Sequence, residues 1–434
     1  MSKKSVGDFL NSFYKEYAYY TIENRAIPHI IDGFKPVQRK IFYTALEYAK
    51  SAYLKTASLS GFTIGTTNYH HGDSSVNGAI TLLSQSFTGA NNIPMFDGEG
   101  NFGNRFIPEA AAARYTKVKL NKQYLNYFTD FEVMDNNGDP DNPEPLTYLP
   151  LIPMVLVNGV DGIAIGFATS ILPRNPDTLK LIIKHKLSGN FKGHVQKSYE
   201  PYFKGFEGKI EWLSDQNCWL MTGICKKKDN VVEVTELPIN FTREKYTAYL
   251  IKLQDRGKIR NFVDKSKEKF HFVINLPKNS NLSDEQLITE FRLQTTLTEN
   301  LTVIDTNGKL HKFNNPDELV DEFIKYRLKK VEERLSRLLD IAISELKFVK
   351  EKAFVIKLIQ DGIINISNLT KEKLKDILKK KNIQNIDRIV SCPFYDFTTD
   401  SYSNLKIKHS DLQKEIDKLT KSDHIKIYME DLKK

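Results

Sequence analysis

The order of apolar and polar positions changes twice along the chain. Apolar residues first recur at helical spacing, which predicts helices over residues 5–24, from Pro36 onward and from about Asp73 onward. Asp32 and Gly33 form a turn signal before the second of these helices, and Pro36 suits the first position of a helix. Two short helices joined by a glycine-containing segment are compatible with a helix-turn-helix or winged-helix module.

Residues 147–313 show a different pattern, with short apolar runs separated by Pro and Asn-Gly, which predicts a β-containing second domain. From Asp317 the apolar positions return to helical spacing and form a stripe over about 45 residues. A shorter charged helix is expected over residues 405–432. Residues 361–403 then form a small unit at the far end of an antiparallel coiled coil. The pattern as a whole predicts an α+β multidomain protein.

Composition adds limits on the class of protein. The 434 residues are 40% hydrophobic and 27% charged, which is typical of globular domains, and the length allows two to four of them. The net charge of +9 favours a polyanionic partner. Three cysteines without a CxxC spacing indicate a reducing compartment. The chain has no long apolar run and no signal-peptide core, so we expect a cytoplasmic protein that does not contact a membrane.

The most informative chemistry lies at Arg114-Tyr115, which follows a run of alanines. Tyrosine is a weak nucleophile at neutral pH because, with a pKa of about 10, only roughly a thousandth of the phenol is ionised. A protein that uses tyrosine for covalent chemistry must surround it with cations and hydrogen-bond donors. The adjacent arginine and the upstream His70-His71 pair are residues of the required kind, so this region is the first candidate site.

Other motifs in the chain are better explained without a cofactor. Gly98–Gly103 matches GxGxxG, but Pro108 follows soon after and no acidic residue lies at the expected spacing, so a glycine-rich loop is the favoured interpretation. The acidic stretch that starts at Asp135 has Pro140 where an EF-hand needs glycine. His70 and His71 lack a third metal ligand, and no P-loop is present, so no metal or nucleotide site is expected on this chain.

Several motifs together connect the chain with a known family: DGFKPVQRK at residues 32–40, YHHGD at 69–73, GNFGNR at 100–105, AAARY at 111–115 and LVNGVDGIAIGFATSILP at 156–173. In these motifs the sequence resembles the breakage-reunion (gyrase A-like) subunit of type IIA DNA topoisomerases. The resemblance covers nearly the first 175 residues. The YHHGD motif matches the eukaryotic form of this motif rather than the bacterial form. No DNA-wrapping domain is expected after the last helix. Relaxation or decatenation is therefore expected rather than negative supercoiling, as in a bacteriophage subunit.

The resemblance implies a role for each matching residue. Tyr115 attacks a DNA phosphodiester and becomes linked to the 5′ phosphate, which opens a double-strand gate for a second duplex. Arg114 clamps the phosphate, His71 hydrogen-bonds a phosphate or ribose oxygen, and Arg39 approaches the nucleophile. Ile171 is expected to wedge between base pairs, with a core position at a strand end left open as the alternative. The expected DNA contacts are Lys35, Lys40, Lys55, His70, Ser74 and Ile171.

The same resemblance implies the domains and partners. It predicts an N-terminal helical arm (1–27), a winged-helix catalytic domain (28–146), a β-rich tower domain (147–315) and a coiled coil with a small helical exit gate (316–434). Double-stranded DNA is the substrate of a homodimer. Mg²⁺ and ATP are both expected to bind to a partner subunit, the gyrase B-like ATPase and metal-binding subunit, and the N-terminal helix is a candidate docking element for it.

Two other functions remain as alternatives. A non-catalytic architectural DNA-binding protein of winged-helix type could keep the fold and the basic groups without the chemistry. A tyrosine recombinase is disfavoured, because those enzymes carry the nucleophile near the C-terminal end, and Tyr115 lies too early. Covalent adducts with DNA that depend on Tyr115 would separate the enzyme from the architectural protein.

Overall fold

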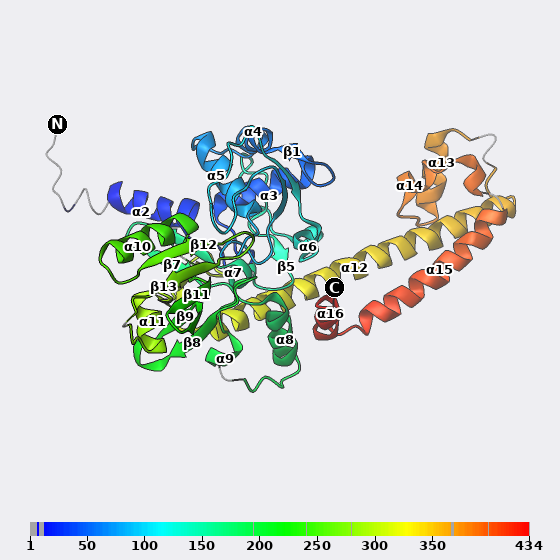
Figure 1. Ribbon diagram of the computed structural model, residues 1–434. Helices are drawn as coiled ribbons and strands as arrows, with labels where there is room; N and C mark the ends of the chain where they lie inside the picture. Colours follow the sequence, from blue (N-terminus) through cyan, green and yellow to red (C-terminus); the bar gives the residue numbers. More distant parts are fainter. Residues whose placement is uncertain are drawn as a thin grey trace. The chain divides into compact units, whose positions relative to one another are not determined.

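The computed structural model describes residue 7 and residues 13–193, 195–239, 241–278, 280–365, 369–397 and 399–433. The chain forms two compact units, Met1–Arg327 with Lys434 and Leu328–Lys433. The start of the helix predicted over residues 5–24 lies outside the described residues. Within them, helix α2 (Lys15–Thr21) continues into a short π-helix, η2 (Ile22–Ala26), and both belong to the first unit (Figure 1).

Three helices and a small sheet follow the arm, and α3 and α5 begin at the residues that the sequence predicts. The first strand lies between α3 and α4, and the other two follow α5. The sheet is antiparallel with the order β1-β3-β2. The elements are α3 (Pro36–Tyr48), β1 (Leu54–Lys55), α4 (Thr56–Thr66), α5 (Asp73–Ser84), β2 (Phe96–Glu99) and β3 (Lys117–Leu120) (Figure 1).

The core of this part forms around α3. Ile41, Phe42 and Ala45 are fully buried on one face of the helix. The Phe42 ring lies 4.7 Å from the ring of Tyr148 and 4.8 Å from that of Phe128, measured between centroids. Each buried aromatic side chain contributes a few kcal/mol through the apolar surface it removes from water. The core therefore fixes α3 against the chain that leads into the second half of the unit.

A two-stranded hairpin and a flanking helix connect this core to the rest of the first unit. Strands β6 (Val160–Ile163) and β7 (Ala168–Ile171) pair antiparallel, with Val160 opposite Ile171. The hairpin is preceded by α7 (Met154–Asn158), whose apolar side chains are buried, and is followed by α8 (Pro176–Leu187). Ahead of α7 lie α6 (Lys122–Leu125), the 3-10 helix η3 (Phe131–Val133) and the paired strands β4 (Phe128–Thr129) and β5 (Leu149–Pro150).

The remainder of the first unit is rich in strands, as predicted. A four-stranded antiparallel sheet has the order β10-β11-β13-β12 and packs on α10 and α11, and a three-stranded sheet has the order β14-β9-β8 (Figure 1). The elements are α9 (Val195–Ser198), β8 (Lys209–Leu213), β9 (Cys218–Thr222), β10 (Ile224–Lys228), β11 (Val231–Glu236), α10 (Arg243–Asp255), β12 (Asn261–Asp264), β13 (Phe272–Asn275), α11 (Asp284–Glu290), β14 (Gln294–Leu297), β15 (Leu301–Ile304) and β16 (Leu310–Phe313).

The second unit is helical. The long helix α12 (Pro316–Gln360) begins in the first unit, and its later part pairs with α15 (Thr399–Thr420) (Figure 1). Glu345 on α12 binds Arg388 at 2.6 Å and Lys408 on α15 at 2.7 Å. A small apolar cluster joins α12 to α13 (Lys371–Lys380) and α14 (Ile386–Val390), and α16 (His424–Asp431) closes the chain. Among the described residues, none of the helices is long and apolar enough to cross a bilayer.

Candidate active site

Tyr115 lies on a firmly held turn between the glycine-rich loop and β3. Its side chain is 69% exposed. Its backbone N–H donates to the Ala112 carbonyl at 2.8 Å, and the buried Thr116 hydroxyl donates to that of Thr56 at 2.8 Å. At the start of α4, the N–H of Thr56 donates to the Thr116 carbonyl, and that of Ala57 donates to the Ala113 carbonyl. The phenol is therefore presented to solvent on a rigid support.

A cation lies over the ring of Tyr115, and two lysines lie on the adjacent strand pair. The Arg114 guanidinium carbon lies 4.8 Å from the centroid of the Tyr115 ring. The exposed Lys55 is opposite Lys117 in the β1–β3 pair and stands at the N-terminus of α4, whose helix dipole also favours an anion. Lys117 forms a 2.6 Å ion pair with Glu99. Arg114 therefore lies over the Tyr115 ring, and Lys55 lies on the strand that pairs with β3, which follows Tyr115.

The glycine-rich loop packs against the turn that carries Tyr115. Gly100 has φ of +106°, and a Cβ at this residue would lie 3.1 Å from the Tyr115 carbonyl oxygen. The Gln85 side chain donates to the carbonyls of Phe102 and Pro108, each at 2.9 Å. Residues 101–112, all described, contain no helix or strand. The loop therefore has a structural role next to Tyr115 and lacks the helix that a dinucleotide site needs.

A second cluster of predicted residues lines a groove of about 550 Å³ along α5. Lys35, His71 and Ser74 all contribute to it, and the sequence did not single out Arg25, which lies in the same groove. Small residues of α5, Gly78 and Ala79 among them, form part of its lining. Tyr115 is not among the residues that line this groove.

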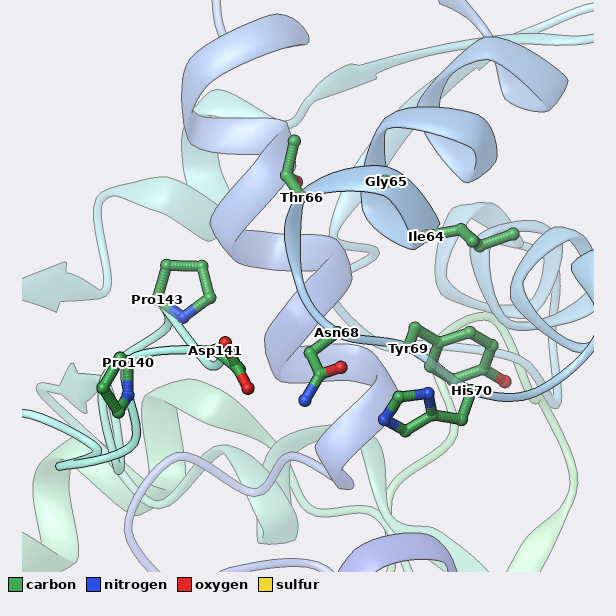
Figure 2. A pocket seen from close by; sticks show the side chains of 9 residues that line it. All are labelled: Ile64, Gly65, Thr66, Asn68, Tyr69, His70, Pro140, Asp141 and Pro143. Atoms are coloured by element: carbon green, nitrogen blue, oxygen red, sulfur yellow. The ribbon is translucent and has the colours of Figure 1, made fainter.

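His70 is not among the residues that line that groove. It lines an open hollow of about 620 Å³ with Asn68 and Tyr69, and across the hollow lies the loop that carries Pro140 and Asp141 (Figure 2). The two adjacent histidines therefore face different surroundings. Of the two, His71 is the one placed beside Lys35 and Arg25.

Arg39 differs from the expectation that it approaches the nucleophile. Its guanidinium forms two hydrogen bonds with the buried Asp32 carboxylate, at 2.8 and 3.0 Å, and a third with the Phe34 carbonyl. Burial by itself lowers the pKa of Arg39, but the Asp32 carboxylate raises it above its ordinary value, so the guanidinium stays charged. Asp32 also accepts from the backbone N–H of Phe34 and Tyr148. Arg39 therefore fixes the turn before α3 rather than facing solvent.

We expect Arg39→Ala to destabilise the protein by about 3–5 kcal/mol, because it leaves the Asp32 carboxylate buried without its cation. Thermal unfolding of the variant measures the effect. Lys50→Ala, an exposed lysine just beyond α3, is the matched control and should change stability little. A variant that keeps its full stability and loses only DNA cleavage would restore the catalytic assignment of Arg39.

Lys40 was expected to contact DNA, but its ammonium group is already saturated. It donates to the Thr67 carbonyl at 2.5 Å, to the Asn142 side chain at 2.7 Å and to Glu144 at 2.6 Å. An ammonium group has three hydrogens, and each of them has an acceptor here. Lys40 therefore ties the acidic loop to the segment that precedes the two histidines.

His29 lies beside this charged network and provides a pH-dependent contribution to stability. Burial lowers its pKa from 6.5 to about 4, with Asp32, Arg39 and Asp305 as the neighbouring charges. Its Nδ1 accepts a hydrogen bond from the Ile31 N–H, which also requires that nitrogen to be unprotonated. The folded chain thus holds His29 neutral at pH values where an unfolded chain protonates it.

We expect the His29 contribution to be fully present above pH 6.5 and to be lost as the pH falls toward 4. Between these values the unfolded state binds one more proton, so acid lowers the free energy of unfolding by on the order of 3 kcal/mol in total. Urea-unfolding midpoints of the wild type and of His29→Gln, compared from pH 7 to pH 4.5, isolate this contribution. A constant difference between the two proteins across that range would contradict it.

The two isoleucines at the ends of β6 and β7 have opposite environments. Ile171 is only 3% exposed, so it occupies the strand-end core position that was left as the alternative to a DNA wedge. Ile163, at the end of β6, is 88% exposed. The apolar pattern offered no reason to prefer one isoleucine, because alternation along a strand does not say which face packs on the protein. Ile163 is the more exposed of these two isoleucines.

No metal-binding group is found among the described residues, since no three His, Cys, Asp or Glu side chains converge there. Cations from arginine and lysine are the groups that this chain itself offers to a phosphate.

Comparisons with known proteins agree with this geometry. The family profile of the DNA gyrase and topoisomerase IV A subunits matches residues 25–433. The DNA topoisomerase medium subunit of Enterobacteria phage T4 is 32% identical over 96% of this chain and 95% of its own length. DNA topoisomerase 2 of Saccharomyces cerevisiae is 30% identical over 84% of this chain and 26% of its own length.

A solved structure is also similar. The crystal structure of the DNA-binding, cleavage and re-ligation domain of Plasmodium falciparum topoisomerase II matches with a TM-score of 0.85 and 28% identity. The match covers 98% of this chain and 63% of that one. The chain thus spans almost all of the T4 subunit, but about a quarter of the yeast relative.

A mixed α+β chain with an exposed tyrosine among cations, matched along nearly its whole length, defines a type IIA topoisomerase component. The chain belongs to the family of DNA gyrase and topoisomerase IV A subunits. It is the DNA-cleavage and religation subunit of a type II DNA topoisomerase, homologous to the T4 medium subunit.

Proposed function

We propose that Tyr115 is the nucleophile of DNA cleavage. Its oxygen attacks a backbone phosphorus, the bond from phosphorus to the 3′ oxygen breaks, and the 5′ phosphate stays on the tyrosine. The phenol loses a proton and the departing 3′ oxygen gains one. Because one phosphodiester replaces another, the reverse attack reseals the strand without an added energy source. The observation that carries this proposal is the 69% exposed phenol beside Arg114 on a turn held by α4.

Arg114 and Lys55 stabilise the negative charge that develops on the phosphate oxygens during this transfer. The α5 groove holds the DNA backbone through Arg25, Lys35 and Ser74, and His71 donates to a phosphate or ribose oxygen. In this role α3, α4, α5 and the small sheet act as a winged-helix DNA-gate domain. Lys40 and Arg39 support the domain from inside and do not contact DNA.

We propose Ile163 as the residue that inserts between base pairs and bends the gate DNA. An apolar side chain that is 88% exposed gains free energy by leaving water for a base stack. The Lys35 ammonium donates to the Asp161 carbonyl at 2.6 Å, which ties the hairpin to the start of α3. The wedge is therefore anchored to the groove that holds the backbone.

Ile163→Ala should reduce DNA bending and lower the rate of cleavage about tenfold, with no change in thermal stability, since the side chain is almost fully exposed. Energy transfer between dyes on the two ends of a duplex reports the bend. Leu181→Ala removes another exposed apolar side chain, on α8, and should leave the bend intact. If Ile171→Ala abolishes bending while the protein stays folded and Ile163→Ala does not, the wedge is Ile171 after all.

The complete reaction requires other subunits. Two copies of this chain cut the two strands, and a gyrase B-like partner binds both Mg²⁺ and ATP. Residues 147–315 serve as the tower, residues 316–434 as the coiled coil and exit gate, and the N-terminal arm (1–27) takes part in docking. The assembled enzyme relaxes or decatenates DNA in a reducing cytoplasm, that of the host cell if the gene is carried by a phage.

Trapping the covalent intermediate tests this function. The chain is mixed with its partner subunit, Mg²⁺ and end-labelled DNA, then denatured, digested and analysed by mass spectrometry. We expect a nucleotide-modified peptide that contains Tyr115. A modified peptide from outside residues 110–120, or a complete absence of adducts with the partner present, would overturn the proposal.

A further inference from the structure

A hydrogen bond links the N-terminal arm to His71. The hydroxyl of Tyr20, on α2, lies 3.2 Å from Nε2 of His71, and the two residues are 51 positions apart in the sequence. Their ring centroids are 6.3 Å apart at an angle of 59°, so the contact is made through the hydroxyl and not by ring stacking. Nothing in the sequence pattern pairs this tyrosine with the histidine.

The arm that carries Tyr20 is fixed to the hairpin beside the groove. Ile22 and Ala26 of the π-helix η2 are buried in an apolar cluster with Ile27 and Ile304. The backbones also touch, because a Cβ on Gly162 of β6 would lie 2.2 Å from the Ala26 carbonyl oxygen. Short π-helical segments often occur at functional sites, where they redirect a side chain. Here the segment directly follows the helix that carries Tyr20.

A second aromatic residue holds the imidazole from another side. The Tyr69 ring meets His71 edge-on, with 5.4 Å between centroids. Both Tyr69 and His71 line the groove with Lys35 and Arg25. An exposed histidine side chain ordinarily samples several rotamers, and fixing one of them costs entropy. Two contacts, one polar and one aromatic, restrict His71 before any DNA arrives.

We propose that Tyr20 is a positioning residue for His71. Its hydroxyl donates to Nε2, which leaves the proton on Nδ1, and Nδ1–H donates to the DNA oxygen in the groove. The N-terminal arm therefore controls the tautomer and the direction of the His71 imidazole. The rate of cleavage then depends on whether the arm is packed against the groove. This inference rests on the proposed role of His71 in the cleavage reaction.

Tyr20→Phe tests the proposal in the full enzyme with its partner subunit. We expect the single-turnover rate of cleavage to fall about three- to tenfold, as for the loss of one hydrogen bond, while the DNA dissociation constant stays unchanged. Tyr17→Phe is the matched control, since Tyr17 is an exposed tyrosine of the same helix, and it should cleave at the wild-type rate. In a His71→Ala background, Tyr20→Phe should have no further effect, because Tyr20 acts only through the imidazole.

Three results would overturn the proposal: an unchanged rate in Tyr20→Phe, an equal loss in Tyr17→Phe, or the same fractional loss with and without His71. The last would mean that Tyr20 acts on DNA or on the fold directly. These outcomes are separate from the test of the nucleophile. If adducts map to Tyr115 and Tyr20→Phe is silent, only the positioning role fails, whereas adducts elsewhere remove the proposed function itself.

Discussion

Tyr115→Phe should eliminate covalent protein–DNA adducts and lower strand cleavage by on the order of 10³-fold or more, because the substitution removes the only atom of this side chain that can attack phosphorus. The phenyl ring keeps its place beside Arg114, and the side chain is exposed, so folding and DNA binding should stay unchanged. Denaturing gels of end-labelled DNA, with the partner subunit and Mg²⁺ present, measure the adduct directly.

Tyr53→Phe provides a closely matched control. Tyr53 is also exposed and also carries a cation over its ring, the Lys119 ammonium at 4.8 Å from the centroid. It differs from Tyr115 in that it precedes β1 and is not held by the turn at the start of α4. Adducts should persist in Tyr53→Phe. Adducts that persist in Tyr115→Phe would show that the nucleophile lies elsewhere and would favour the architectural DNA-binding function for this turn.

Strong local signals explain the elements that the sequence predicted correctly. Pro36 marks the start of α3, and the apolar face that includes Ile41 and Ala45 is buried. Helix α4 was missed because it contains Gly61 and Gly65 together with several threonines, which are poor helix formers and hide the apolar spacing. Packing against α3 and α5 forms this helix in spite of its weak propensity.

Side-chain roles were harder to predict than elements, because they depend on partners distant in sequence. The basic residues around α3 suggested a DNA-facing surface, but the partner of Lys40 is Glu144, 104 positions later. No local sequence pattern predicts an ion pair between residues so far apart. The partner of Arg39 was nearer, since Asp32 belongs to the same motif, and an acid seven positions before the arginine could have suggested the ion pair.

Arg114→Lys should lower the rate of cleavage about a hundredfold although it keeps the positive charge. An arginine offers a planar fork of donors that matches two phosphate oxygens, whereas a lysine offers a point charge that cannot bind both in one geometry. Removal of a preorganised donor from a transition-state oxyanion costs on the order of 10²–10³ in rate, so Arg114→Ala should fall at or below the lysine variant. Single-turnover cleavage at saturating DNA measures this chemical step.

Lys117→Ala is the control for charge near the site, since Lys117 lies close in sequence but is paired with Glu99 at 2.6 Å. Removal of the Lys117 side chain should slow cleavage less than threefold. If Arg114→Lys cleaves at the wild-type rate, then charge alone is sufficient and the guanidinium fork has no special role. If Arg114→Lys weakens DNA binding and leaves the rate at saturation unchanged, Arg114 holds the ground state and not the transition state. These outcomes differ in what they say about Arg114. They show whether it lowers the free energy of DNA binding or the activation free energy of the chemical step.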